Sequence, residues 1–223
     1  MPRKGKLVSQ CEEIGWPLHI ALAEYVSKKH WNYAGLQRLN PEEVICKQLT
    51  EKDKHCSWCE GASINILIKA ATLDVLEKLN TFSDREDAVR RYLEAQLTIL
   101  AKSKNEIIDQ ILSISKERLI NNIIEICSDD IIKHFYPKIR FDFICLLSDS
   151  ITRSDLFDIA SIFSENPYDY RSGWPDITVI DKSGIEFIEV KTTDYLHASQ
   201  LRFASDIAKP LGLSCSVYQL KPK

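Results

Sequence analysis

The stretch GWPDITVIDKSGIEFIEVK, which runs from Gly173 to Lys191, decides how the fold of this chain is predicted. Two runs of β-forming residues, ITVI and IEFIEV, flank the turn sequence DKSG, a pattern typical of a β-hairpin. Alternate side chains of a strand share one face, so Glu189 and Lys191 point the same way. An unpaired carboxylate on a central strand is costly, and its usual partners are a cation of the protein or a metal ion.

Asp176 opens the first strand of this hairpin, and pairing of the two strands brings it towards Glu189. Two neighbouring carboxylates repel each other unless a cation lies between them. Mg²⁺ and Mn²⁺ accept carboxylates, water and a backbone carbonyl such as that of Val190, and they activate water for attack on phosphate. Lys191 would then hold the attacking water or neutralise developing charge. The alternative for the Glu-x-Lys pair alone is a solvated edge strand.

Composition sets further limits on the class of protein. The chain has 223 residues, of which 44% are hydrophobic, as in an ordinary globular protein. The sequence has no long apolar run and no secretory signal, so we expect an intracellular protein with no membrane partner. In a eukaryote its expected location is the nucleus, and in a prokaryote or a phage host it is the cytoplasm or nucleoid. The net charge of −3 excludes a protein that coats nucleic acid through overall basicity, so any such contact must be local.

The apolar periodicity predicts helices along most of the chain before the hairpin. We expect loops over 31–59, with at most one helical turn after Pro41, and the segment 137–147 fits either a helix or a strand. After the hairpin, a helix and a last strand, SCSVYQL, complete a strand, strand, helix, strand order. The ranges predicted as helices are 18–30, 62–79, 84–101, 104–127, 129–135, 155–164 and 198–211.

The segment from Tyr170 to Leu220 resembles the PD-(D/E)xK nucleases, and within them the virus-type replication-repair nuclease domain. The similarity rests on YRSGWPDITVI, FIEVK and the glutamine of HASQLRF. It implies that Asp176 and Glu189 bind a metal ion, that Lys191 is the catalytic lysine, and that Gln200 lies beside them as a further catalytic residue.

Upstream, HCSWCEGASINILIKAATL resembles the start of a long helix in the Fanconi-associated nuclease family, where a His-x-(x)-Glu-Gly pattern supplies an acidic ligand. This resemblance implies that Glu60 is a third acidic metal ligand. The region 80–165 would correspond to the helical bundle that this family inserts before its PD motif. The chain departs from the family pattern at Thr192 and Thr193, which replace Gly-Pro, and at Trp174, which replaces an aliphatic residue.

The resemblance implies an α/β (α+β) fold with a restriction-endonuclease-like mixed sheet, flanked by helices and interrupted by an inserted helical bundle. We therefore expect an N-terminal helical and loop segment (1–59), a first-acid helix with the bundle (60–165) and a nuclease core (166–223). Residues 60–223 would form one compact catalytic unit.

Basic residues near the PD motif are candidates for contact with DNA phosphates. The alternative for each is a solvated surface charge. The candidates are Arg171, Lys182 and Arg202. Trp174 is predicted to pack against the core rather than to stack on a base.

Four residues upstream also suit a zinc site, because two of the cysteines have the CxxC spacing. One CxxC without a second pair favours buried free thiols instead, and the odd total of seven cysteines also indicates reduced thiols. The four residues are Cys46, His55, Cys56 and Cys59.

The resulting prediction is a nuclease that requires Mg²⁺ or Mn²⁺ and hydrolyses phosphodiester bonds of DNA, with selectivity for flapped or branched DNA in repair or replication. Two alternatives stay open. One is a resolvase-like or restriction-like nuclease, which would act as a two-fold dimer, and the other is a non-catalytic DNA-binding module on the same fold. Whether repair proteins or a second copy of the chain are partners is also open.

Overall fold

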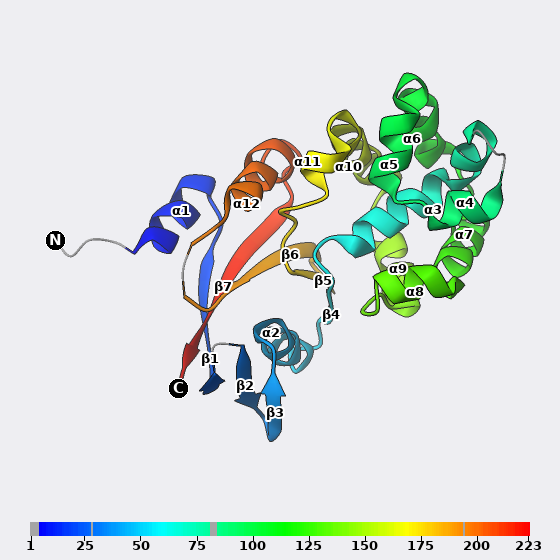
Figure 1. Cartoon of the computed structure of the whole chain (residues 1–223). Coiled ribbons are helices and arrows are strands. Elements are labelled where there is room, and N and C mark those ends of the chain that lie inside the picture. Colours follow the sequence, from blue (N-terminus) through cyan, green and yellow to red (C-terminus); the bar gives the residue numbers. More distant parts are fainter. Residues whose placement is uncertain (1–4, 28, 81–83, 194) are drawn as a thin grey trace. The chain divides into compact units, whose positions relative to one another are not determined.

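The computed structural model describes residues 5–27, 29–80, 84–193 and 195–223. Contacts divide the chain into two compact parts (Figure 1). The residues up to Glu60 combine with Gly173–Lys223 in what we call the sheet unit, and Gly61–Ser172 form the helical unit. This grouping differs from the predicted boundaries at residues 59 and 165, because strands from both ends of the chain pair in one sheet.

The sheet unit contains a seven-stranded mixed sheet in the order β3-β2-β1-β7-β6-β5-β4. Strands β1 and β6 each pair with β7 in parallel, and the other neighbours are antiparallel. The predicted α+β class, with a mixed sheet flanked by helices, is confirmed. The strands are β1 (Leu18–Ser27), β2 (His30–Tyr33), β3 (Leu36–Leu39), β4 (His55–Trp58), β5 (Ile177–Asp181), β6 (Gly184–Lys191) and β7 (Ser214–Pro222).

Helices cover both faces of this sheet. On one face α2 packs through Val44, Ile45 and Leu49 against residues that include Ile188 and Val190 of β6. The helices of the unit are α1 (Lys6–Ile14), α2 (Pro41–Thr50) and α12 (Ala198–Phe203), and α12 continues as the π-helical turn η2 (Ala204–Ala208).

The opposite face of β6 carries an aromatic cluster. Trp174 is 2% exposed, and its ring lies 4.6 Å from that of Phe203 and 5.8 Å from that of Phe187 between centroids. Trp16, which follows α1, meets Phe203 edge-on at 6.2 Å. The prediction that Trp174 packs against the core is therefore confirmed.

The helix predicted over 18–30 is wrong, because residues 18–27 form β1 and His30 begins β2. The large apolar side chains of this strand are not the buried ones, so their spacing predicted the wrong structure. Ile20 and Leu22 are 52% and 48% exposed, whereas the small Ala21 and Ala23 face the core. Small residues give only a weak alternation of hydrophobicity along the strand. The strand is stabilised by its pairing with β7, which lies far away in the sequence, and with β2, which follows it.

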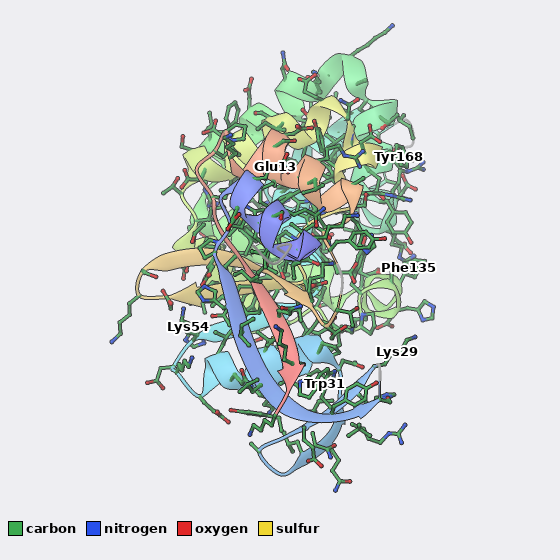
Figure 2. The ribbon with its side chains drawn as sticks, turned by 90° about the vertical axis from the view of Figure 1, so that its left-hand side faces the viewer. Glu13, Lys29, Trp31, Lys54, Phe135 and Tyr168 are labelled. Atoms are coloured by element: carbon green, nitrogen blue, oxygen red, sulfur yellow. The ribbon has the colours of Figure 1, made fainter. Side chains whose placement is uncertain are left out.

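The expectation of loops over 31–59 is also wrong, since β2, β3 and β4 lie in this range, and the helical turn expected after Pro41 is the start of the longer helix α2. Trp31 of β2, labelled in Figure 2, is buried against the same core as α2. The helix starts with Pro41, and the Asn40 backbone N–H donates to Glu43 Oε2 at 2.8 Å. This bond satisfies one donor at the helix start, as in half of a capping box.

The helical unit is built around α3, whose residues are buried along nearly its whole length. The predicted helix over 62–79 is confirmed. The helices predicted over 84–101 and 104–127 are each divided into two. The break in 104–127 lies at Ser115, whose hydroxyl accepts the Arg118 N–H at the start of α7. Of the ambiguous segment 137–147, residues 141–147 are helical and belong to α9, whereas 137–140 precede the helix. The helices are α3 (Ala62–Leu79), α4 (Arg85–Arg90), α5 (Leu93–Ile99), η1 (Ala101–Ser103), α6 (Lys104–Ser113), α7 (Lys116–Ser128), α8 (Asp130–Phe135), α9 (Phe141–Ser150), α10 (Arg153–Glu165) and α11 (Pro167–Tyr170).

Within the described part of the chain, no helix combines the length and the apolar character that crossing a bilayer requires.

Gly173 positions the loop that leads into Asp176. Its φ is +92°, and a Cβ placed there would lie 2.2 Å from the backbone oxygen of Ser199, at the start of α12. We predict that Gly173→Ala lowers the free energy of unfolding by roughly 3 kcal/mol or more, because the substitution adds a clash with backbone to an unfavourable φ.

Gly15→Ala is the matched control, since Gly15 has φ +76° but nothing within 4 Å of the added atom. It should cost only about 1 kcal/mol. Urea denaturation of both variants measures the difference. Equal losses would show that the close approach to Ser199 is absent in solution.

Candidate active site

The candidate site lies where β6 extends past the end of β5. The β5 ladder ends with Ile177 opposite Ile188, whereas the parallel ladder to β7 continues to Lys191. Asp176, the residue before β5, occupies the position beside the extension, and its Oδ2 accepts the Val190 N–H at 2.8 Å. The N–H and C=O of one strand residue point to the same side, so the Val190 carbonyl faces the same space as Asp176.

Glu189 is the most deeply buried charged group of this site, with only 1% of its side chain exposed. Its Oε1 accepts two charge-assisted bonds, from Lys191 Nζ at 2.7 Å and from Gln200 Nε2 at 2.5 Å. Its Oε2 is buried and takes no hydrogen bond from a donor among the described residues, and the Asp176 carboxyl lies close enough to share a proton with Glu189. Buried polar atoms are rarely left in this state, so Oε2 marks a place for a ligand.

Gln200 owes its orientation to the start of α12. Its Oε1 accepts the backbone N–H of His197, the residue before the helix, at 2.8 Å. The amide oxygen is thereby engaged, so the amide NH₂ must face Glu189. The predicted position of Gln200 beside the acidic residues agrees with this geometry.

The carboxylates are held at a cost that a cation would relieve. Burial raises the pKa of Asp176 to about 6, and the charges of Glu42 and Glu60 raise it further, against the Val190 bond and Lys191. Burial also raises the pKa of Glu189 to about 8, with the charge of Asp176 adding to it and Lys191 opposing it. The charged forms of both carboxyl groups are therefore unfavourable in the folded protein, and a bound metal ion would stabilise them.

These residues fit a divalent cation. The donors on offer are oxygens of Asp176 and Glu189 and the Val190 carbonyl, a set that suits Mg²⁺ or Mn²⁺. Among the described residues, however, no group of three His, Cys, Asp or Glu side chains is gathered as in a three-ligand metal site.

Glu60, the predicted third ligand, lies at the end of the sheet unit. It follows β4, has a φ of +48° and an exposed side chain, and its backbone N–H bonds the Asp176 carbonyl at 3.3 Å. Helix α3 starts only at Ala62, so Glu60 precedes the helix rather than lying in its first turn. The metal-binding role of Glu60 stays a prediction.

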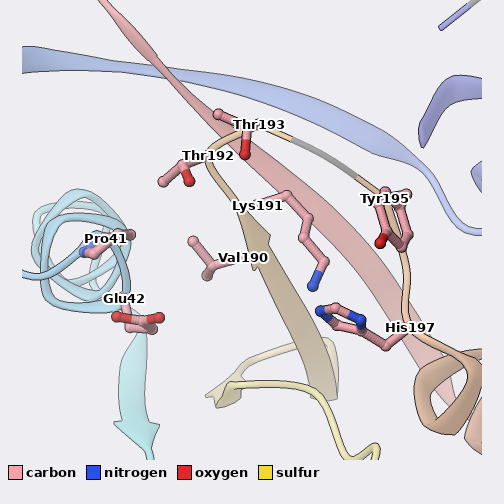
Figure 3. A pocket seen from close by; sticks show the side chains of 8 residues that line it. All are labelled: Pro41, Glu42, Val190, Lys191, Thr192, Thr193, Tyr195 and His197. Carbon is pink, nitrogen blue, oxygen red and sulfur yellow. The ribbon is translucent and has the colours of Figure 1, made fainter. Parts of the chain in front are cut away.

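A polar pocket of about 190 Å³ opens beside Lys191. Figure 3 shows the Glu42 carboxylate on one side of the β6 end and the His197 ring close to the Lys191 ammonium on the other. Sequence reasoning missed three residues of this pocket, Glu42, Tyr195 and His197. The Asn40-to-Glu43 cap is the signal that would have placed Glu42 in the first turn of a helix. The lining residues are Pro41, Glu42, Val190, Lys191, Thr192, Thr193, Tyr195 and His197.

The three predicted DNA-contacting residues lie in different segments of the chain, and their role stays a prediction. Lys182 lies in the hairpin turn, at the opposite end of β6 from Lys191 and roughly 25 Å away by strand length. Figure 2 places Lys54 near that same turn, where its ammonium pairs with Asp181 at 2.7 Å. Arg171, within the helical unit, pairs with Glu94 at 3.5 Å, and Arg202 is half-buried in α12.

Comparisons with known proteins identify a structural likeness. Neither the scan against protein-family models nor the search of curated proteins gave a match. Two crystal structures of paFAN1, bound to 5′ flap DNA with a gap and flaps of 2 and 1 nt, match 93% of this chain, each with a TM-score of 0.62, at 12% and 13% identity. The chain spans 38% of the length of the paFAN1 chains. The likeness is one of fold.

We predict that the stability of the metal-free protein falls as the pH rises from about 4.5 to about 8. Glu189 has a raised pKa, so its folded form retains a proton that the unfolded chain loses above its ordinary pKa. The contribution is fully present at low pH and is lost as the pH passes through the folded value. Thermal unfolding in EDTA at pH 5 and pH 8 measures this effect.

Glu189→Gln should reduce the pH dependence, because the amide is neutral and its NH₂ can donate towards Asp176. Glu13→Gln, an exposed position on α1 (Figure 2), is the control and should leave the pH profile as in the wild type. An unchanged profile in Glu189→Gln would contradict the assignment.

Proposed function

We propose that this chain is a DNA nuclease that uses Mg²⁺ or Mn²⁺ to hydrolyse phosphodiester bonds. The observation that carries the proposal is the buried Glu189 carboxylate, with one oxygen held by Lys191 and Gln200 and the other, beside Asp176, taking no hydrogen bond from a donor among the described residues. An arrangement that leaves a carboxylate oxygen unsatisfied in the interior has a clear use when that oxygen binds a cation.

In this proposal Asp176, Glu189 and the Val190 carbonyl hold the cation, with Glu60 as the further ligand that the family resemblance implies. A bound divalent ion would lower the pKa of water and stabilise negative charge on the phosphate. Asp176 is fixed for this role by its bond from the Val190 N–H, so its free oxygen keeps one direction.

Lys191 acts on the phosphate or on the attacking water. Its ammonium has three donors, and the bond to Glu189 Oε1 uses one of them. The side chain is 12% exposed and lines the polar pocket, so the remaining donors can reach a bound phosphodiester. A positive charge held beside the reacting group stabilises the charge that develops during hydrolysis.

The proposed substrate is DNA with a flap or a branch. Support comes from the fold likeness to paFAN1, which was crystallised with 5′ flap DNA, and from the resemblance of the sequence motifs to the Fanconi-associated nuclease family. The proposal places this activity in DNA repair or replication.

The test is cleavage of labelled single-stranded, duplex, flap and four-way-junction DNA with Mg²⁺ or Mn²⁺, with EDTA as the negative control. We predict that Lys191→Ala lowers kcat on flap DNA by roughly 100- to 1000-fold, since it removes one electrostatic stabiliser of the transition state. Asp176→Asn should be at least as impaired, because it removes a charged ligand.

Lys52→Ala is the matched control, an exposed lysine on the turn after α2, and it should cleave at the wild-type rate. Wild-type activity in Lys191→Ala would overturn the proposed role of Lys191. Symmetric cutting of four-way junctions by a dimer would favour a resolvase instead, and DNA binding without metal binding or cleavage would favour a non-catalytic module.

A further inference from the structure

Helix α2 brings a third carboxylate to the pocket. Glu42 lies in the first turn of the helix, is half-buried and lines the pocket together with Val190 and Lys191 (Figure 3). In that view the Glu42 side chain lies on the same side of β6 as that of Val190, whose backbone N–H donates to Asp176 Oδ2.

The position of Glu42 is rigidly defined by its helix. Val44, Ile45 and Leu49 of α2 are at most 1% exposed and pack on the face of β6 that carries Val190. Because α2 is packed along this face, the backbone of Glu42 is held beside the end of β6.

Glu42 also acts on Asp176 more strongly than the predicted ligand Glu60 does. Of the two acidic neighbours, Glu42 makes the larger electrostatic contribution at Asp176. Glu60 has an exposed side chain at the end of the sheet unit. The acidic residue that lines the pocket therefore comes from α2, and it acts on Asp176 beside the end of β6.

We propose that Glu42 is a further acidic group of the site and that it binds the divalent cation through the cation's water molecules. The proposal rests on the proposed function. Once a bound ion displaces the proton of Glu189, the carboxylates of Asp176, Glu189 and Glu42 and the ammonium of Lys191 sum to two negative charges, which a single divalent ion balances. The buried Glu189 Oε2, which takes no hydrogen bond from a donor among the described residues, is the separate sign that a ligand enters beside Asp176.

Contact through water, rather than direct coordination, follows from the geometry. No three acidic side chains among those described are close enough to bind one ion together. The pocket of about 190 Å³ has room for roughly six waters, since one water takes about 30 Å³. Mg²⁺ usually keeps several waters and binds through one or two carboxylates, which leaves the waters to bond a further acidic group.

The experiment is a calorimetric titration of the whole chain with Mn²⁺, without DNA. We expect Glu42→Gln to weaken Mn²⁺ binding about 10-fold or more, because loss of an outer-shell partner usually has an effect of this size. Glu42→Asp should recover most of the affinity, since it retains the charge. Glu13→Gln is the surface control and should bind as the wild type does.

The rise in melting temperature on adding Mn²⁺ gives a second readout that does not depend on activity. It should be smaller in Glu42→Gln than in the wild type, while the melting temperature in EDTA confirms that the variant is folded. Wild-type Mn²⁺ affinity in folded Glu42→Gln, with affinity lost in Asp176→Asn, would overturn this inference and leave the proposed function standing. Absence of Mn²⁺ binding in the wild-type chain would instead overturn the proposed function.

Discussion

Burial of one carboxylate constrains the whole sheet unit. Glu189 is on a strand with neighbours on both sides, where an anion is tolerated only with partners. Lys191 and Gln200 supply those partners, but to the same oxygen. Because both donors bond Oε1, Oε2 is the oxygen left for a ligand. The same contacts constrain the start of α12, because Gln200 donates to Glu189 while its amide oxygen accepts the His197 N–H.

The mixed sheet makes this arrangement possible by ending its strands at different levels. Strand β6 keeps its ladder to β7 after β5 has ended, so the backbone of Val190 is paired on one side and turned to Asp176 on the other. Helix α2 covers one face of this extension and α12 lies on the other. The site thus forms where two helical layers meet the uneven edge of one sheet.

The sequence alone was sufficient for the parts whose signals are local. The hairpin over 177–191 and helix α3 were predicted because turn residues and apolar periodicity lie within the segment itself. Strand β1 was missed because its stability comes from pairing with β7, almost two hundred residues later, and because Ala21 and Ala23 are too small to reveal the buried face.

The same distinction applies to the site. Asp176, Glu189 and Lys191 share one hairpin, so their proximity followed from strand geometry. Glu42 was missed because its place depends on how α2 packs against β6, and no spacing along the chain encodes that contact. Lys182 was grouped with the site by its closeness in sequence, although the hairpin carries it to the far end of the strand.

The helical unit begins at Gly61, after β4, and ends at Ser172, before β5. These two strands are neighbours in the sheet, since Trp58 pairs with Ile177. In topological terms the whole unit occupies the place of a hairpin turn. Loop-closure entropy grows only slowly with length, so a segment in such a place can be lengthened, shortened or exchanged at modest thermodynamic cost. The register that aligns Asp176 with the end of β6 is set by the strands on either side, so the inserted region can diversify while the chemistry of the strand ends is preserved.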